Sequence, residues 1–193
     1  MNAIEDLREE HEAVRLTLRI LDKIIVETSK AGRVPRPGDM DQLLDFFSIF
    51  VDTCHHGKEE EQLFPAMEAV GVSRDGGPIG VMLKEHEEGR GHVKAMRAAL
   101  KRSHEGTTGA VDDLIRHARA YIQMLEQHIQ KENRVLFPMA IRHLSTAKLN
   151  ELNDGFEKIE TDKIGTGRHE AFHRMLDSMK SVYLLKKGGL HDH

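Results

Sequence analysis

The chain has 193 residues, enough for one domain that buries about 70% of its unfolded surface. Its 28 basic and 32 acidic residues give a formal charge of −4 and are well mixed, so there is no segregated basic face for nucleic acid or for a membrane. The single cysteine, Cys54, excludes an internal disulfide framework, and no signal peptide or spanning segment is apparent. We therefore expect a cytoplasmic protein with a small-molecule partner.

The first two expected helices cover residues 3–31 and 40–69. In the first, apolar residues recur with a period of about 3.6 until a glycine and a proline end the pattern. His11 falls on this apolar stripe, so its side chain should point inward. In the second, Asp39 is a suitable N-cap, and a phenylalanine-rich stretch precedes the histidines.

Four long helices joined by short connections favour an all-α fold, an antiparallel up-down four-helix bundle. Two shorter C-terminal helices would lie beside it. We expect the bundle domain over residues 1–144 and a C-terminal helical extension over residues 145–193. The helices after the first two are expected at residues 78–104, 110–143, 146–160 and 168–186.

One motif occurs twice in the chain. Residues 55–65 and 128–138 both follow the pattern His-x-x-Lys-Glu-x-x-x-Leu-Phe-Pro. A Glu-His-Glu triplet also recurs, centred on His11 and on His86. Each half therefore has a helix with one inward histidine, followed by a helix with a His-x-x-x-Glu pair. Two such hairpins packed together would approximate a two-fold axis.

This repeat brings histidines and glutamates to the bundle interior. Residues i and i+4 lie about 40° apart around a helix, so each His-x-x-x-Glu pair shares a face. Buried carboxylates are strongly destabilising unless a cation compensates them. Imidazole and carboxylate donors suit iron or manganese, and zinc less well; six donors indicate two metal ions bridged by the carboxylates. The candidate ligands are His11, His55, Glu59, His86, His128 and Glu132.

A simpler interpretation exists for each residue taken alone. A single inward histidine is more often a hydrogen-bonded core residue, and Glu59 could be a solvated charge beside Glu60 and Glu61. The matched positions in two repeats favour the metal site instead.

The same motifs resemble those of the hemerythrin-like (HHE cation-binding) domain family. The resemblance covers about residues 3–143, and the stretches 77–86 and 128–138 are most similar to di-iron proteins that repair iron centres under nitrosative stress. It implies that the four histidines bind two non-haem iron ions (Fe–O–Fe). It also implies that Glu59 and Glu132 are the bridging carboxylates.

Two positions depart from the oxygen-carrying hemerythrins. Those carriers have a fifth histidine one turn after the third-helix histidine and an aspartate five residues after the fourth-helix histidine, where this chain has Arg90 and Asn133. Fewer histidines should leave more coordination positions for water or an added ligand, which favours reaction with dioxygen, nitric oxide or peroxide. A reversible dioxygen carrier or sensor stays open as an alternative. Whether the protein is an enzyme, and its oligomeric state, are left open.

Two residues near the expected ligands have two interpretations each. Gly89, one turn after the third-helix histidine, could leave space for an added ligand or form a close helix contact. Tyr121, two turns before the fourth-helix histidine, could hydrogen-bond a bound ligand or pack as a core tyrosine.

The first motif also predicts some local helix geometry. Cys54 and His56 each lie about 100° around the helix from the motif histidine, so we expect both off the ligand face. Pro65 and Pro138 each remove a backbone donor, so a kink or a helix end is expected there.

A second metal motif occurs near the C-terminus. Residues 169–173 read His-Glu-x-x-His, the pattern in which two histidines bind zinc and the glutamate acts as a base in peptidases. No third ligand follows at the usual spacing, so a zinc peptidase is a minor alternative. His169 and His173 could also be surface histidines, part of a second metal site, or part of a lid over the first site.

Overall fold

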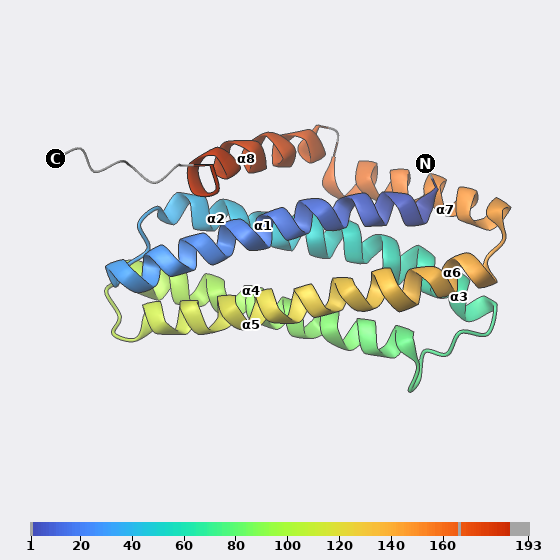
Figure 1. The fold of residues 1–193 in the computed structure, drawn as a ribbon, viewed down its shortest axis with the longest axis horizontal. Helices are drawn as coiled ribbons and strands as arrows, with labels where there is room; N and C mark the ends of the chain where they lie inside the picture. Colours follow the sequence, from blue (N-terminus) through green and yellow to red (C-terminus); the bar gives the residue numbers. More distant parts are fainter. Residues whose placement is uncertain (1, 166, 186–193) are drawn as a thin grey trace.

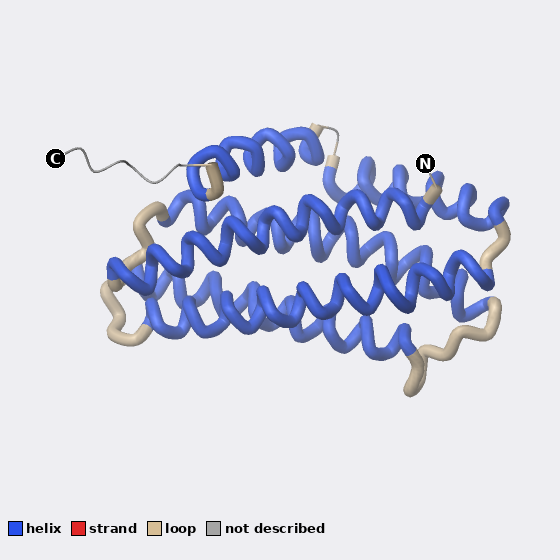
Figure 2. The backbone as a smooth tube through the Cα atoms, in the orientation of Figure 1, coloured by secondary structure: helices blue, strands red, loops and turns tan. Residues whose placement is uncertain are grey.

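The computed structural model describes residues 2–165 and 167–185. Within these residues every regular element is a helix and there is no strand, as Figure 2 shows. The all-α prediction is therefore confirmed. The α-helices are α1 (Ala3–Ala31), α2 (Pro37–Phe46), α3 (Phe64–Ala69), α4 (Pro78–His104), α5 (Ala110–Lys131), α6 (Phe137–His143), α7 (Thr146–Ile159) and α8 (Arg168–Tyr183).

Four further stretches are π-helical, with wider turns whose hydrogen bonds join residues i and i+5. Two of them join α2 to α3 into one continuous helical segment, 37–69, and one joins α5 to α6 into the segment 110–143. The π-helical stretches are η1 (Phe47–His56), η2 (Glu59–Leu63), η3 (Glu132–Leu136) and η4 (Glu160–Ile164).

Four long helical segments lie side by side and run in alternating directions, as Figure 1 shows. They are α1, the segment 37–69, α4 and the segment 110–143. α4 packs along α5, α1 packs on both α2 and α5, and α2 packs on α4. α7 and α8 lie along one side of this group, where both contact α1.

The apolar core is divided into two clusters with a polar layer between them. On α1, residues 3–7 belong to one cluster and residues 14–25 to the other, with Glu10 and His11 between. On α4 the two clusters are separated in the same way around His86. Apolar packing at both ends therefore holds the helices together, and the buried polar side chains gather in the middle.

The start of α2 differs from expectation. Asp39 does not cap this helix: Pro37 begins it, Arg36 is the N-cap residue, and Asp39 lies in the first turn. Proline suits the first helical position because its fixed φ is helical and its missing N–H would be unpaired there anyway. The carboxylate of Asp39 is still favourable near the helix N-terminus, where the helix dipole is positive.

At the two motif prolines, where a kink or a helix end is expected, the helix does not end. The helix continues through Pro65 and Pro138, and a π-helical stretch lies directly before each Phe-Pro pair. The backbone N–H of Phe64 and that of Phe137 close the last wide turns on the carbonyls of Glu59 and Glu132, respectively. The duplicated motif thus gives the same local deviation twice, beginning at the motif glutamate each time.

The C-terminal helices α7 and α8 share the core of the rest of the chain. Phe156 of α7 and Phe172 of α8 are buried in the two apolar clusters, and Phe172 packs edge-on against Phe46 at a centroid distance of 5.4 Å. Ser145 caps α7 through its side chain. The proposed boundary after residue 144 falls there and stays a prediction. No helix of the described part is both long and apolar enough to cross a membrane.

Candidate metal centre

All six predicted ligands are buried in the polar layer between the apolar clusters. Their ligating atoms form two overlapping groups of four, each group lying within 4.8 Å. Both groups contain the two glutamates; one adds the histidines of α1 and η1, and the other adds those of α4 and α5. The six residues are His11 of α1, His55 of η1, Glu59 of η2, His86 of α4, His128 of α5 and Glu132 of η3.

Each glutamate presents one carboxylate oxygen to each histidine pair. Oε1 of Glu59 lies 3.8 Å from Nε2 of His55, and Oε2 lies 3.4 Å from Nε2 of His86. Glu132 divides its oxygens in the same way between the other two histidines, each at 3.1 Å. A carboxylate placed in this way could bridge two cations, each bound by one pair of histidines.

Six inward-facing atoms of this site make no hydrogen bond, whereas Nε2 of His11 and Nε2 of His55 lie 3.1 Å apart and can share one. Both oxygens of Glu59 and of Glu132, and Nε2 of His86 and of His128, are buried without a hydrogen-bond partner among the described residues. Buried polar atoms are nearly always paired, and buried carboxylates require a compensating cation. Oxygen and imidazole nitrogen donors are those that iron and manganese prefer. The residues present therefore fit a metal site.

The electrostatics of the site also favour a cation. Burial opposes the charge of an imidazolium, yet the Glu132 carboxylate raises the pKa of His128 to about 10. Burial likewise opposes the charge of Glu132, but His128 and His11 beside it hold the pKa of this carboxyl well below its usual range. Metal binding at such a site displaces protons from the imidazoles.

Two histidines are oriented by glutamates from the Glu-His-Glu triplets. Nδ1 of His55 donates a hydrogen bond to Oε2 of Glu10 at 2.7 Å, and Nδ1 of His128 donates to Oε2 of Glu85 at 2.9 Å. The first glutamate of each triplet therefore supports a histidine on a different helix. A partner on the outer nitrogen fixes the tautomer and directs Nε2 inward.

The other two histidines are oriented by the residues that directly follow the motif glutamates. Nδ1 of His86 donates to Oε1 of Glu60 at 2.7 Å, and Nδ1 of His11 donates to Oδ1 of Asn133 at 3.3 Å. Asn133, which stands where the carriers have an aspartate, therefore lies outside the ligand groups and positions a histidine. Its neutral amide makes the surroundings of His11 less negative than those of the other three.

The motif lysines complete this outer layer. Lys58 is fully buried and donates to Asp6 and Glu10, at 2.7 Å each, and to Glu160 of η4 at 2.5 Å. Burial opposes its charge, but the carboxylates raise the pKa of Lys58 above its usual value. The matching Lys131 donates to Glu85 and is about half exposed. The sequence could have indicated a role for these lysines, because both belong to the repeated motif.

A cavity of about 230 Å³ leads from α4 and α5 to the site, and both His86 and His128 line it. Gly89 lies in its wall, where an added Cβ would meet Cε of Met124 at 3.2 Å and Cε2 of Tyr121 at 3.6 Å. Gly89 therefore fits both interpretations: it lines the cavity, and it is also in close contact with side chains of the neighbouring helix. Tyr121 is buried and packs edge-on against Phe47 at a centroid distance of 4.8 Å.

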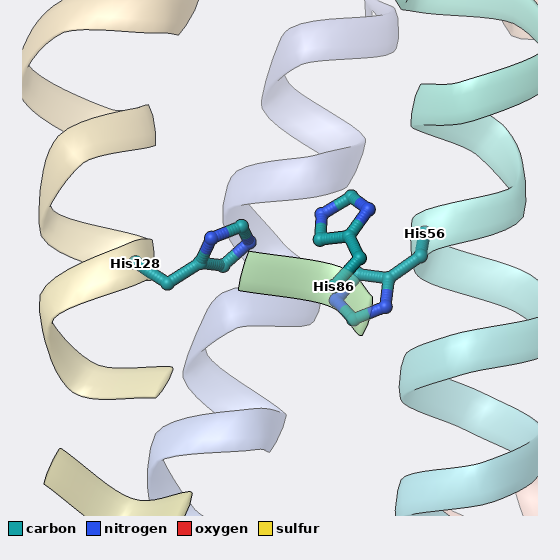
Figure 3. Close-up of side chains that lie close together, drawn as sticks. All are labelled: His56, His86 and His128. Carbon is teal, nitrogen blue, oxygen red and sulfur yellow. The ribbon is translucent and has the colours of Figure 1, made fainter. Parts of the chain in front are cut away.

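The prediction that His56 points away from the site is wrong. Its ring is buried and stacks on His86, with centroids 3.7 Å apart and an interplanar angle of 12° (Figure 3). Residues 47–56 are π-helical, so successive side chains turn through a smaller angle than in an α-helix and two adjacent histidines reach the interior. Cys54 is also buried, and burial raises the pKa of its thiol, but it belongs to no metal-binding group of the described residues.

The His-Glu-x-x-His stretch does not form a comparable site. The rings of His169 and His173 lie 4.8 Å apart, but no third donor joins the two in the part of the chain that the structure describes. His169 instead lies near Glu10 and Glu160, which both accept hydrogen bonds from Lys58. The geometry therefore gives no support to a zinc peptidase.

The fold is all-helical in the described residues, and its buried histidines and glutamates fit a metal site. The model of the Hemerythrin HHE cation binding domain matches residues 2–140, so the chain belongs to this family. The predicted resemblance is confirmed.

Relatives of the chain include proteins of two kinds. An uncharacterized protein of Mycobacterium tuberculosis is 26% identical over 183 residues, which is 94% of this chain and 71% of that protein. The iron-sulfur cluster repair protein YtfE of Dickeya chrysanthemi is 30% identical over 128 residues, and YtfE of Cronobacter sakazakii is 27% identical over 138 residues. Each YtfE match covers 63% of this chain and 58% of the relative. No solved structure matches the chain.

Proposed function

We propose that the protein is a non-haem di-iron protein. One iron ion is held by His11 and His55, the other by His86 and His128, and Glu59 and Glu132 bridge the two. The observation that carries this proposal is the division of each carboxylate's oxygens between the two histidine pairs. Membership of a cation-binding family and the iron-related name of the YtfE relatives support iron over manganese or zinc.

We infer that the four long segments constitute an up-down four-helix bundle around this centre. Helices of such bundles carry inward donors that meet in the middle of the core. The polar layer between two apolar clusters has this arrangement. α7 and α8 then act as an addition that covers one side.

The protein is proposed to bind or react with a small oxidant or diatomic molecule, namely dioxygen, nitric oxide or peroxide. Bound iron would supply redox chemistry and open coordination positions. The chain supplies the cavity that reaches His86 and His128 and the carboxylates that hold the histidines in one tautomer. The YtfE relatives are named iron-sulfur cluster repair proteins, and we propose a role in the repair of iron centres under stress for this chain as well. Reversible carriage of dioxygen is the second candidate.

The ligand assignment is tested by the double variant Glu59→Gln/Glu132→Gln. Loss of both bridging charges should release iron from the anaerobically loaded protein, whereas Glu61→Gln, on an exposed side chain of the same helix, should retain it. Iron content after gel filtration is the measurement. Equal iron in both variants would mean that the bridges are elsewhere.

The two candidate functions are separated by the reaction of the ferrous protein with dioxygen. A spectrum that forms and then reverses under argon indicates a carrier. Rapid oxidation that argon does not reverse indicates chemistry or sensing, which is the result we expect. Parallel mixing with nitric oxide and with hydrogen peroxide shows which of these ligands reacts.

A further inference from the structure

We propose that Glu160 is a positioning residue that couples the C-terminal helices to metal binding at the position of His11 and His55. This inference rests on the proposed di-iron centre. It adds to that centre a part of the chain beyond the family match, which ends at residue 140. Glu160 begins η4, between α7 and α8, and is connected to the ligand His55 through two intervening side chains.

A continuous chain of hydrogen bonds joins Glu160 to His55. Oε1 of Glu160 accepts from Nζ of Lys58 at 2.5 Å. The same nitrogen donates to Oε1 of Glu10 at 2.7 Å, and Oε2 of Glu10 accepts from Nδ1 of His55 at 2.7 Å. The two intervening side chains are buried, so solvent screens their charges little. The charge of Glu160 can therefore act on the imidazole through Lys58 and Glu10.

The charge of Glu160 should strengthen metal binding. Lys58 donates to three carboxylates, those of Asp6, Glu10 and Glu160. Without the charge of Glu160, Lys58 offsets more of the charge on Glu10, and Glu10 then polarises the imidazole of His55 less. A carboxylate on the outer nitrogen raises the basicity of a ligating histidine. Loss of part of that negative charge therefore weakens the bond between His55 and a metal ion.

The C-terminal helices cover the first copy of the repeated motif. η4 packs on η1, and α7 packs on η2. An added Cβ at Gly57 would already lie 3.8 Å from Cγ2 of Ile159, so a small residue there lets η4 approach closely. The matching residue of the second copy is Gln130, which is exposed. The C-terminal helices are therefore coupled to one half of the duplicated site.

The matched variants are Glu160→Gln and Lys163→Met. Lys163 also joins η4 to the first motif, but its partner Glu61 is exposed and belongs to neither ligand group. Each variant therefore loses one ion pair at the same contact between helices. Circular dichroism of the metal-free variants checks that both fold, and loss of iron to a chelator is the measurement.

The two variants should differ in iron release. Glu160→Gln should release iron about three- to tenfold faster than the unchanged protein, which is less than the roughly 10- to 100-fold effect usual for a direct partner of a ligand. Lys163→Met should release iron at the unchanged rate. Equal rates in the two variants would overturn the proposal, because a residue that only holds η4 in place would give this result.

A cycle of variants with Glu10→Gln tests the route. If Glu160 acts through Glu10, Glu160→Gln should have little further effect on iron affinity in protein that already carries Glu10→Gln. Effects of the two substitutions that simply add would show that Glu160 acts by another route, and would overturn the proposal while leaving the di-iron centre intact. Unchanged protein that binds no iron would overturn both the centre and the role of Glu160.

Discussion

Oε2 of Glu10 accepts a hydrogen bond from Nδ1 of His55 at 2.7 Å, although Glu10 is the sequence neighbour of His11. The same crossing occurs in the second half, where Glu85 supports His128. Each Glu-His-Glu triplet therefore joins two helices of its half. The histidine of the triplet faces the site, and its first glutamate holds the motif histidine of the next helix.

This relationship predicts the effect of Glu10→Gln. The amide oxygen can still accept from His55, but its charge is lost, so metal affinity should fall about 10- to 100-fold, as is usual for outer partners of ligands. Competition with a chelator measures this affinity. Glu9→Gln, on the exposed adjacent residue, is the control and should have no effect. Equal affinities of the two variants would contradict the role of Glu10.

The duplicated lysines provide a matched pair for stability. Lys58→Met leaves three carboxylates around a fully buried position, which should lower the free energy of unfolding by about 3–5 kcal/mol. Lys131→Met removes a half-exposed partner of Glu85, which should lower the free energy of unfolding by about 1 kcal/mol or less. Urea unfolding of metal-free protein measures both. Similar losses in the two variants would show that burial of Lys58 is not decisive.

The C-terminal helix should respond to alkaline pH through Tyr183. Its hydroxyl donates to Oδ2 of Asp39 at 2.6 Å, and burial together with Asp39 raises the pKa of Tyr183. Because the folded-state pKa is raised, this bond contributes stability in full below about pH 10 and loses it as pH rises through the folded-state pKa. The contribution is about 1 kcal/mol or less, because the side chain is only partly buried.

Hydrogen exchange of α8 across this pH range, compared with Tyr183→Phe, is the measurement. The difference in protection between the two proteins should shrink above about pH 10. Tyr121, the other tyrosine, is present in both and cancels. A difference that does not change with pH would contradict this assignment.

The cavity predicts unequal effects of two substitutions at Gly89. Gly89→Ala pushes only the flexible end of Met124, so ligand binding should hardly change, and helix propensity should add up to about 1 kcal/mol of stability. Gly89→Leu fills the cavity and should slow binding of azide to the iron-loaded protein in stopped-flow mixing. Iron content is the control for both. Equal rates in both variants would mean that ligands enter by another path.

The duplicated pattern predicted the six buried donors because helical period and repeat position are visible in the sequence. His11 and His86 followed from apolar stripes of ordinary α-helices. The structure brings all six donors together. Their role as ligands stays a prediction, as do the cytoplasmic location and the physiological ligand.

His56 could not be predicted in the same way. In an α-helix, His56 would lie about 100° around the axis from His55, away from the ligand face. No residue pattern predicted that residues 47–56 are π-helical. The pairing of Glu10 with His55, and of Lys58 with Glu160, depends on which helices become neighbours. Contacts between residues so distant in sequence cannot be read from periodicity.

The central claim is that Glu59 and Glu132 bridge two iron ions. Anaerobic titration of metal-free protein with iron-57, followed by Mössbauer spectroscopy in an applied field after oxidation, tests it most directly. We predict binding of two irons per chain that are magnetically coupled through their shared ligands. Binding of one iron or none, or of two irons without coupling, would contradict the claim.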